Sequence, residues 1–119
     1  SGEHHKMHAM TEIATSTPIP TLNLEVTPDA KDGFNVLFKT ENFEFTPETV
    51  NQVNEEGKGH AHLYLNGKKV ARIYGEWFHV SSGLMKEGDN LLEATLNAND
   101  HSEWAVDGEH ISDSILVAK

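Results

Sequence analysis

Hydrophobic and polar residues alternate with a period of two over most of the chain from residue 21 onward. In residues 21–26, Leu22 and Leu24 alternate with polar residues, and further along Phe43 and Phe45 stand two positions apart. Successive side chains of a β-strand point to opposite faces, so each such segment predicts a strand with one buried face. Nine segments suggest strands, from which we expect about seven or eight strands in the fold: residues 21–26, 33–40, 42–47, 60–65, 68–74, 77–80, 91–97, 104–106 and 115–117.

The strongest turn signal is Asn66-Gly67, which joins residues 60–65 to residues 68–74. Asn-Gly is the preferred pair for the type I′ turn of a two-residue hairpin. This turn would also define the register of the two strands. The predicted pairs are Leu63 with Val70, His62 with Ala71 and His60 with Ile73.

A helix is expected only as a single turn at residues 47–51, with Thr46 as its cap. About seven or eight short strands without a longer helical stretch predict an all-β fold, an antiparallel β-sandwich. We expect residues 19–119 to form this one domain. Residues 1–18 show no strand period and end in a run rich in Thr and Pro, which predicts a flexible tail.

Composition narrows the possible functions of this domain. The 119 residues include 9 Lys+Arg and 19 Asp+Glu, for a net charge of -10, which argues against a simple nucleic-acid binder. No apolar run approaches the roughly 18–20 residues of a membrane span. The absence of Cys excludes disulfides, zinc–thiolate sites and thiol nucleophiles.

The chemistry that remains is carried by eight histidines. His60 and His62 lie two apart in a predicted strand, so their imidazoles leave the same face and a rigid backbone presents two nitrogen donors to one ion. The other face, which includes Ala61 and Leu63, is the expected core stripe. The plainer interpretation is that both histidines are polar residues on a solvent-facing strand.

His79 and His101 are the further candidates for the same site. Three or four imidazole nitrogens suit a tetragonal Cu(II) ion, or a tetrahedral Zn(II) ion as the alternative. Asp100 is a candidate either as a ligand or as the group that orients an imidazole. The open alternatives are a half-buried His79 with one backbone hydrogen bond and a loop-capping His101. We expect His110 to be a surface residue.

The predicted tail holds a second group of metal-binding residues, which are His4, His5, Met7, His8 and Met10. Thioether sulfur is a soft ligand that selects Cu(I), and imidazole binds copper in either oxidation state. A flexible segment with both donors can wrap a copper ion without a preformed cavity. A disordered tail or tag remnant is the alternative, whereas Met85 is expected to be packing material.

Three segments carry a resemblance to a known group of proteins: residues 59–67, 72–79 and 96–102. Over residues 20–118 the chain resembles small exported bacterial β-sandwich proteins, and its layout is similar to the copper-carrying CopC type and to cupredoxin-like domains. The resemblance implies an exported Ig-like or cupredoxin-like sandwich that binds copper. Without Cys, a blue-copper site is not expected. His60-x-His62 also resembles the copper strand of copper–zinc superoxide dismutases, but the disulfide and the Gly-rich zinc loop of that family are missing, so dismutation is not expected.

These observations favour an exported copper-binding protein, a carrier, buffer or resistance factor in the periplasm or outside the cell, rather than an enzyme. We expect Cu(II) at the strand histidines and Cu(I) at the tail, release by ligand exchange or by imidazole protonation near pH ~6, and another copper-handling protein as partner. Ser1-Gly2-Glu3 at the start fits a trimmed form without its leader. The alternatives are a structural or adhesive Ig-like module and, behind it, a copper- or zinc-dependent enzyme.

Overall fold

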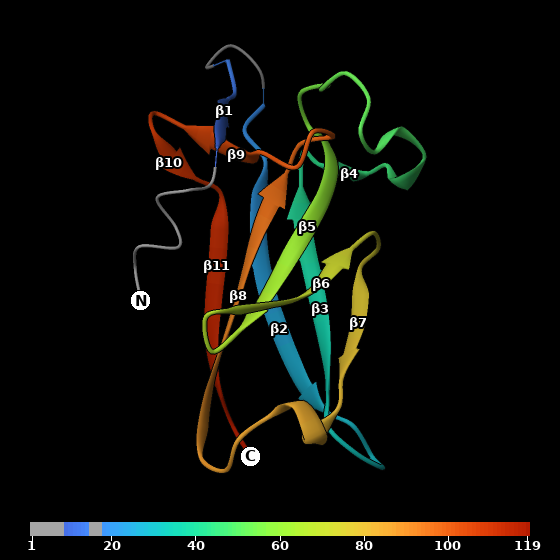
Figure 1. Cartoon of the computed structure of the whole chain (residues 1–119), viewed down its shortest axis with the longest axis vertical. Helices are drawn as coiled ribbons and strands as arrows, with labels where there is room; N and C mark the ends of the chain where they lie inside the picture. Colours follow the sequence, from blue (N-terminus) through green and yellow to red (C-terminus); the bar gives the residue numbers. More distant parts are fainter. Residues whose placement is uncertain (1–8, 15–17) are drawn as a thin grey trace.

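The computed structural model describes residues 9–14 and 18–119, which form two β-sheets (Figure 1). The larger sheet has the order β1-β9-β8-β5-β4, with β10 beside β9, β11 beside β8 and β6 beside β5. The smaller sheet has the order β2-β3-β7. Its strands are β2 (Thr21–Pro28), β3 (Phe34–Glu41) and β7 (Trp77–Val80). The larger sheet comprises β1 (Met10–Glu12), β4 (Glu44–Phe45), β5 (Lys58–Leu65), β6 (Lys68–Ile73), β8 (Asp89–Asn97), β9 (Glu103–Val106), β10 (Glu109–His110) and β11 (Ser112–Ala118).

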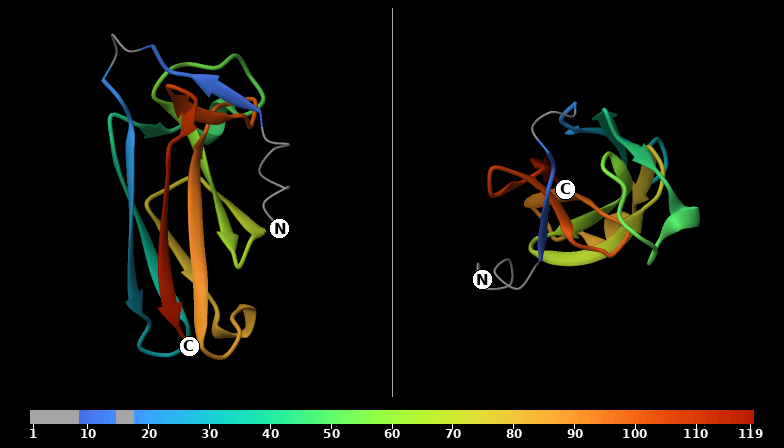
Figure 2. Two further views of the ribbon diagram at one scale, coloured as in Figure 1. Left: turned by 90° about the vertical axis from the view of Figure 1, so that its left-hand side faces the viewer. Right: turned by 90° about the horizontal axis from the view of Figure 1, so that it is seen from above.

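The two sheets face each other, and the side view shows them as separate layers (Figure 2). Their inner faces supply one apolar core, in which Val36 and Phe38 of β3 and Leu63 of β5 are fully buried. The backbone amide of Leu24 donates to the Asp113 carboxylate across the edge between β2 and β11 (2.8 Å). The predicted all-β sandwich is therefore confirmed.

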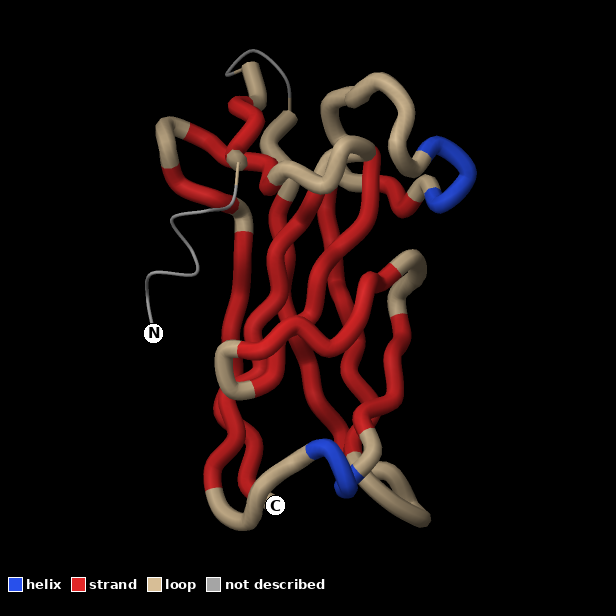
Figure 3. The backbone as a smooth tube through the Cα atoms, in the orientation of Figure 1, coloured by secondary structure: helices blue, strands red, loops and turns tan. Residues whose placement is uncertain are grey.

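Helical structure in the described residues is limited to two short 3-10 turns at opposite ends of the molecule (Figure 3). They are η1 (Pro47–Thr49), where the single turn was predicted, and η2 (Ser82–Leu84). The described chain contains eleven strands instead of seven or eight, because short strands such as β1 and β10 have too few residues to show a period. Two pairings, β1 with β9 and β4 with β5, are parallel rather than antiparallel.

The amino-terminal part corrects the predicted extent of the tail. Met10–Glu12 form β1 and pair with Glu103–Ala105 of β9. Ile13, only 4% exposed, packs into the core. Residues 10–13 thus belong to the fold, and a strand of three residues leaves no readable alternation in the sequence. Residues 1–8 and 15–17 lie outside the described residues.

The hairpin between β5 and β6 turns at Asn66 and Gly67, whose φ values of 51° and 85° are those of a type I′ turn. Next to the turn, Leu65 pairs with Lys68 and Tyr64 with Lys69, and then an extra residue on β6 shifts the register. Beyond this bulge the observed pairs are Leu63 with Ala71, His62 with Arg72 and Ala61 with Ile73, so all three predicted pairs are wrong by one residue.

The bulge in β6 is explained by core packing, and it decides on which face the nearby cations lie. Val70 and Ala71 both pack against the core, which two consecutive residues of a regular strand cannot do. The bulge leaves one residue of β6 without a partner on β5. Lys69 and Arg72 therefore lie on the same face of the sheet, although they are three positions apart, and they pair with Tyr64 and His62. The hairpin thereby places two cations on the outer face of β5.

Gly59 allows β5 to approach β8 closely just before the first strand histidine. Its φ of 148° is unfavourable for other residues, and a Cβ atom at this position would collide with the Asn97 carbonyl. We expect Gly59→Ala to lower the free energy of unfolding by about 2 kcal/mol or more, measured by urea denaturation. Gly75→Ala is the matched control, since an added Cβ would meet no other atom within 4 Å there. Equal stability of the two variants would contradict this account.

Candidate metal centre

Two of the predicted ligands leave the outer face of β5, away from the core. His60 pairs with Asn97 of β8 and His62 pairs with Thr95, so a row of polar side chains runs across both strands. Despite this outward direction, His60 is only 1% exposed and His62 only 3%. The first alternative, two solvent-facing polar residues, is therefore wrong.

The third imidazole arrives from the loop that joins β8 to β9 and lies near the start of β5 (Figure 1). His101 has a φ of 73°, and its backbone amide donates to the Ala98 carbonyl (2.8 Å). The Asn97 side-chain amide donates to the His101 carbonyl (3.0 Å). This tight turn aims the His101 ring back toward β5.

A network of hydrogen bonds, which we call the loop latch, attaches this loop to the segment around η1. Asn51 donates its backbone amide to the Asn99 carbonyl (2.7 Å), and the Asn99 side chain donates to the Val53 carbonyl (2.8 Å). The Asn51 side-chain oxygen accepts a hydrogen bond from Nε2 of His101 (2.9 Å). With its hydrogen on Nε2, the His101 ring directs the lone pair of Nδ1 toward the other two histidines.

The three rings meet around Nε2 of His60. This atom lies 3.0 Å from Nε2 of His62 and 3.1 Å from Nδ1 of His101, and one nitrogen from each residue falls within 4.8 Å of the others. A ring nitrogen of a neutral imidazole carries one hydrogen or one lone pair, so Nε2 of His60 cannot form a full hydrogen bond to both neighbours. A metal ion would accept a lone pair from all three. The three residues could therefore hold a metal ion.

Burial keeps these imidazoles unprotonated. Desolvation lowers the pKa of His60 to about 4 and that of His62 to about 3, with smaller contributions from nearby positive groups that include Lys69 and Arg72. Desolvation is also the main cause of the lowered pKa of His101. Neutral imidazoles are the metal-binding form, so His60 and His62 need not release a proton before binding. The expected release by protonation near pH ~6 is wrong for these two residues.

The cluster opens onto a cavity of about 270 Å³. Its lining residues are Ala9, His62, Tyr64, Lys69, Asn97, Asp100, His101 and Ser102. The Tyr74 ring covers His60, with 5.3 Å between the ring centroids. An ion held by the three nitrogens would thus be shielded on one side and reachable from the other.

Asp100 lies at this cavity but does not contact the imidazoles through a hydrogen bond. Its carboxylate accepts hydrogen bonds from the backbone amide (3.0 Å) and the hydroxyl (2.6 Å) of Ser102, and the Ser102 hydroxyl is the main cause of its lowered pKa. Asp100 therefore shapes the loop that carries His101, and the predicted role as orienting group falls instead to Asn51.

The structure does not bring His79 to this cluster, which corrects that prediction. His79 belongs to β7 in the smaller sheet, is exposed, and contacts the Asn35 side-chain oxygen through Nδ1 (2.9 Å). The sequence order of the strands suggested a neighbour of the hairpin, but β7 pairs with β3.

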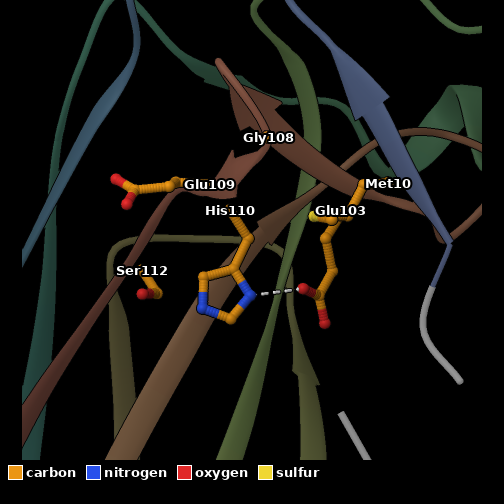
Figure 4. Close-up of a pocket in the computed structure, with 6 residues that line it drawn as sticks. All are labelled: Met10, Glu103, Gly108, Glu109, His110 and Ser112. Atoms are coloured by element: carbon orange, nitrogen blue, oxygen red, sulfur yellow. Dashed lines mark hydrogen bonds and ion pairs between the residues drawn. The ribbon is translucent and has the colours of Figure 1, made fainter. Parts of the chain in front are cut away.

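Of the tail candidates, His4, His5, Met7 and His8 lie outside the described residues. Met10 is in β1, where it lines a different pocket together with Glu103 and His110 (Figure 4). His110 is exposed, as expected, and its Nδ1 lies 2.7 Å from the buried Glu103 carboxylate. Met85 is 5% exposed in the core, as expected.

Neither a protein-family model, nor a curated protein, nor a solved structure matches this chain. Within the part of the chain that the structure describes, no helix has the length and apolar character needed to cross a bilayer. The described fold and residues thus define the class of this protein: an all-β sandwich with a three-histidine group able to hold a metal ion.

The buried imidazoles predict a pH dependence of stability. In the unfolded chain a histidine takes up a proton near pH ~6.5, whereas folded His62 does so only near 3. The unfolded state therefore gains protons first as pH falls from about 6.5 to 4, and the metal-free protein should lose roughly 1 kcal/mol per pH unit for each such imidazole. Urea denaturation at several pH values measures this loss. His62→Gln should reduce the slope, and an unchanged slope would contradict the proposed cause.

Proposed function

We propose that this protein binds copper, with His60, His62 and His101 as the ligands of its principal site. The observation that carries the proposal is the convergence of three imidazole nitrogens, two of them on nearly buried residues with strongly lowered pKa values. Burying polar rings without full hydrogen bonding costs free energy, and a bound ion would offset that cost.

Ligand preference, more than geometry, favours Cu(II) over Zn(II). For metal–nitrogen distances of about 2.0–2.1 Å, two ligands at a right angle are about 2.8–3.0 Å apart, and two at the tetrahedral angle about 3.3–3.4 Å. The observed separations of 3.0 and 3.1 Å are compatible with the right-angle value, but they are also ordinary hydrogen-bond distances, so the choice of Cu(II) rests on ligand preference. Right angles are typical of tetragonal Cu(II), which also binds nitrogen ligands more tightly than Zn(II) does.

We further propose that the protein is exported and that it carries, buffers or sequesters copper rather than catalysing a reaction. The chain has no Cys, and imidazole and thioether ligands avoid the oxidation that thiolates undergo outside the cytoplasm. The resemblance to CopC-type and cupredoxin-like sandwiches points in the same direction. A carrier needs a site that an ion can enter and leave, and the cavity beside His62 and His101 meets that need.

The donors of the tail would serve capture or transfer of the ion to a copper-handling partner. His4, His5, Met7 and His8 are connected to the sandwich at Ala9, which lines the same cavity as His62 and His101. Met10 follows in β1. This attachment supports a path for the ion between the two groups of ligands, with Cu(I) favoured by the thioethers.

The principal site is tested by Cu(II) titration of the full chain against a competing chelator, followed by electron paramagnetic resonance. We expect the double variant His60→Ala/His62→Ala to weaken the tightest Cu(II) binding by about a hundredfold or more, since two nitrogen ligands are lost. The wild-type spectrum should show several equivalent nitrogen donors.

His79→Ala is the matched control, because it removes an exposed strand histidine outside the cluster. It should retain wild-type Cu(II) affinity. Equal losses in His79→Ala and the double variant would overturn the assignment. Unchanged Cu(II) affinity in the double variant would place Cu(II) binding outside the strand histidines, whereas no Cu(II) binding by the wild type would favour a structural module.

The role of the tail is tested by deleting residues 1–8. We expect the shortened chain to keep Cu(II) binding at the sandwich and to lose most of its Cu(I) capacity, measured by competition with a Cu(I)-specific chromophore. If the deletion abolishes Cu(II) binding while the double histidine variant does not, the sandwich is only a scaffold for the tail.

A further inference from the structure

Two cations stand on the same face as the three histidines. Lys69 pairs with Tyr64 and lines the cavity, and Arg72 pairs with His62. The Arg72 guanidinium lies 3.4 Å from the Tyr74 hydroxyl, and the Tyr74 ring covers His60. In a chain of net charge -10, this local excess of positive charge results from the β6 bulge.

The neighbouring carboxylates balance the charge of a metal ion at this site only in part. Asp100 is held by Ser102, while Glu93 and Glu103 act on Tyr64, whose pKa burial and these two carboxylates raise to about 12. The ionised side chains that act on His60 and His62 are Lys69 and Arg72. The Asp100 carboxylate does act on His101, but it is one negative charge against Lys69 and Arg72, and three neutral imidazoles add none, so a divalent ion would be only partly compensated.

We propose that the cavity beside the three histidines is a binding site for a small anion, which joins the metal ion as an additional ligand and is held by Lys69, with Arg72 adding to the attraction. This inference rests on the copper site proposed above. Three nitrogen donors leave at least one position of a four-coordinate ion open. A cavity of about 270 Å³ has room for an anion of a few atoms together with water.

Lys69 and Arg72 have opposite effects on the binding of the metal ion and of the anion. They repel the metal ion and attract the anion, so removal of one of them should change the two affinities in opposite directions. A purely structural lysine would not produce this pattern.

Azide is the probe, because it is a small anion whose binding to Cu(II) gives a charge-transfer absorption band. We expect azide to bind to Cu(II)-loaded wild-type protein and to bind about five- to tenfold more weakly to Lys69→Gln, with a smaller loss in Arg72→Gln. Without azide, Lys69→Gln should bind Cu(II) as tightly as the wild type or more tightly.

Lys68→Gln is the matched control, since it removes the same charge from the neighbouring position, which pairs with Leu65 on the opposite face. It should leave azide affinity unchanged. Asp100→Asn tests whether the protein itself supplies the anion: if azide binds only to this variant, Asp100 is the additional ligand and the proposal is overturned. Azide binding that is equally strong in Lys69→Gln and the wild type also overturns it.

If the proposed copper site itself is wrong, the experiments give a different result. In that case His60→Ala/His62→Ala would give the same Cu(II) spectrum as the wild type, and the azide series would report on another location. A wild-type Cu(II) spectrum that depends on both histidines, with azide binding indifferent to Lys69, overturns the anion site alone.

Discussion

The pairing of β5 with β8 is the constraint on which the candidate site depends. It fixes His60 opposite Asn97 and His62 opposite Thr95, and it continues directly into the loop that returns His101 to β5. The close approach at Gly59 makes this pairing possible at its upper end. The sandwich core holds the inner face of β5 in place, so the outer face can carry a polar group that contributes little to packing.

The protonation state of His60 and His62 depends on what covers the outer face of β5. An exposed His-x-His pair would titrate near pH ~6.5 and would exchange ligands with water. Covered by Tyr74 and by the β8–β9 loop, the same pair stays neutral over the whole physiological range. Desolvation and neighbouring positive charge both disfavour a proton, but an ion that forms three bonds can still compete. The site would therefore favour a metal ion over a proton, because the ion bonds to three nitrogens at once and a proton bonds to only one.

Much of this site was accessible from the sequence. The period of two placed His60 and His62 on one face, and Asn-Gly located the hairpin turn. The register beyond the turn was not accessible, because Val70 and Ala71 both reach the core through a bulge that only tertiary packing requires. His79 was misplaced for a related reason: strand order in a sandwich follows crossovers between the sheets, and β7 joins β3. Asn51 lies fifty positions from His101 and carries no motif.

The loop latch gives the three nitrogen donors unequal freedom. His62 is fixed by ladders on both sides of β5, and His60 by its pairing with Asn97 of β8. His101 lies in a loop, where hydrogen bonds within the turn hold its backbone and Asn51 of a surface segment holds its ring. Displacement of that segment would remove the contact between Asn51 and the His101 ring and leave the pairing of β5 with its neighbours in place. In the copper site proposed above, His101 would therefore be the ligand with the least fixed position. An incoming competitor could replace it without disturbing the sandwich.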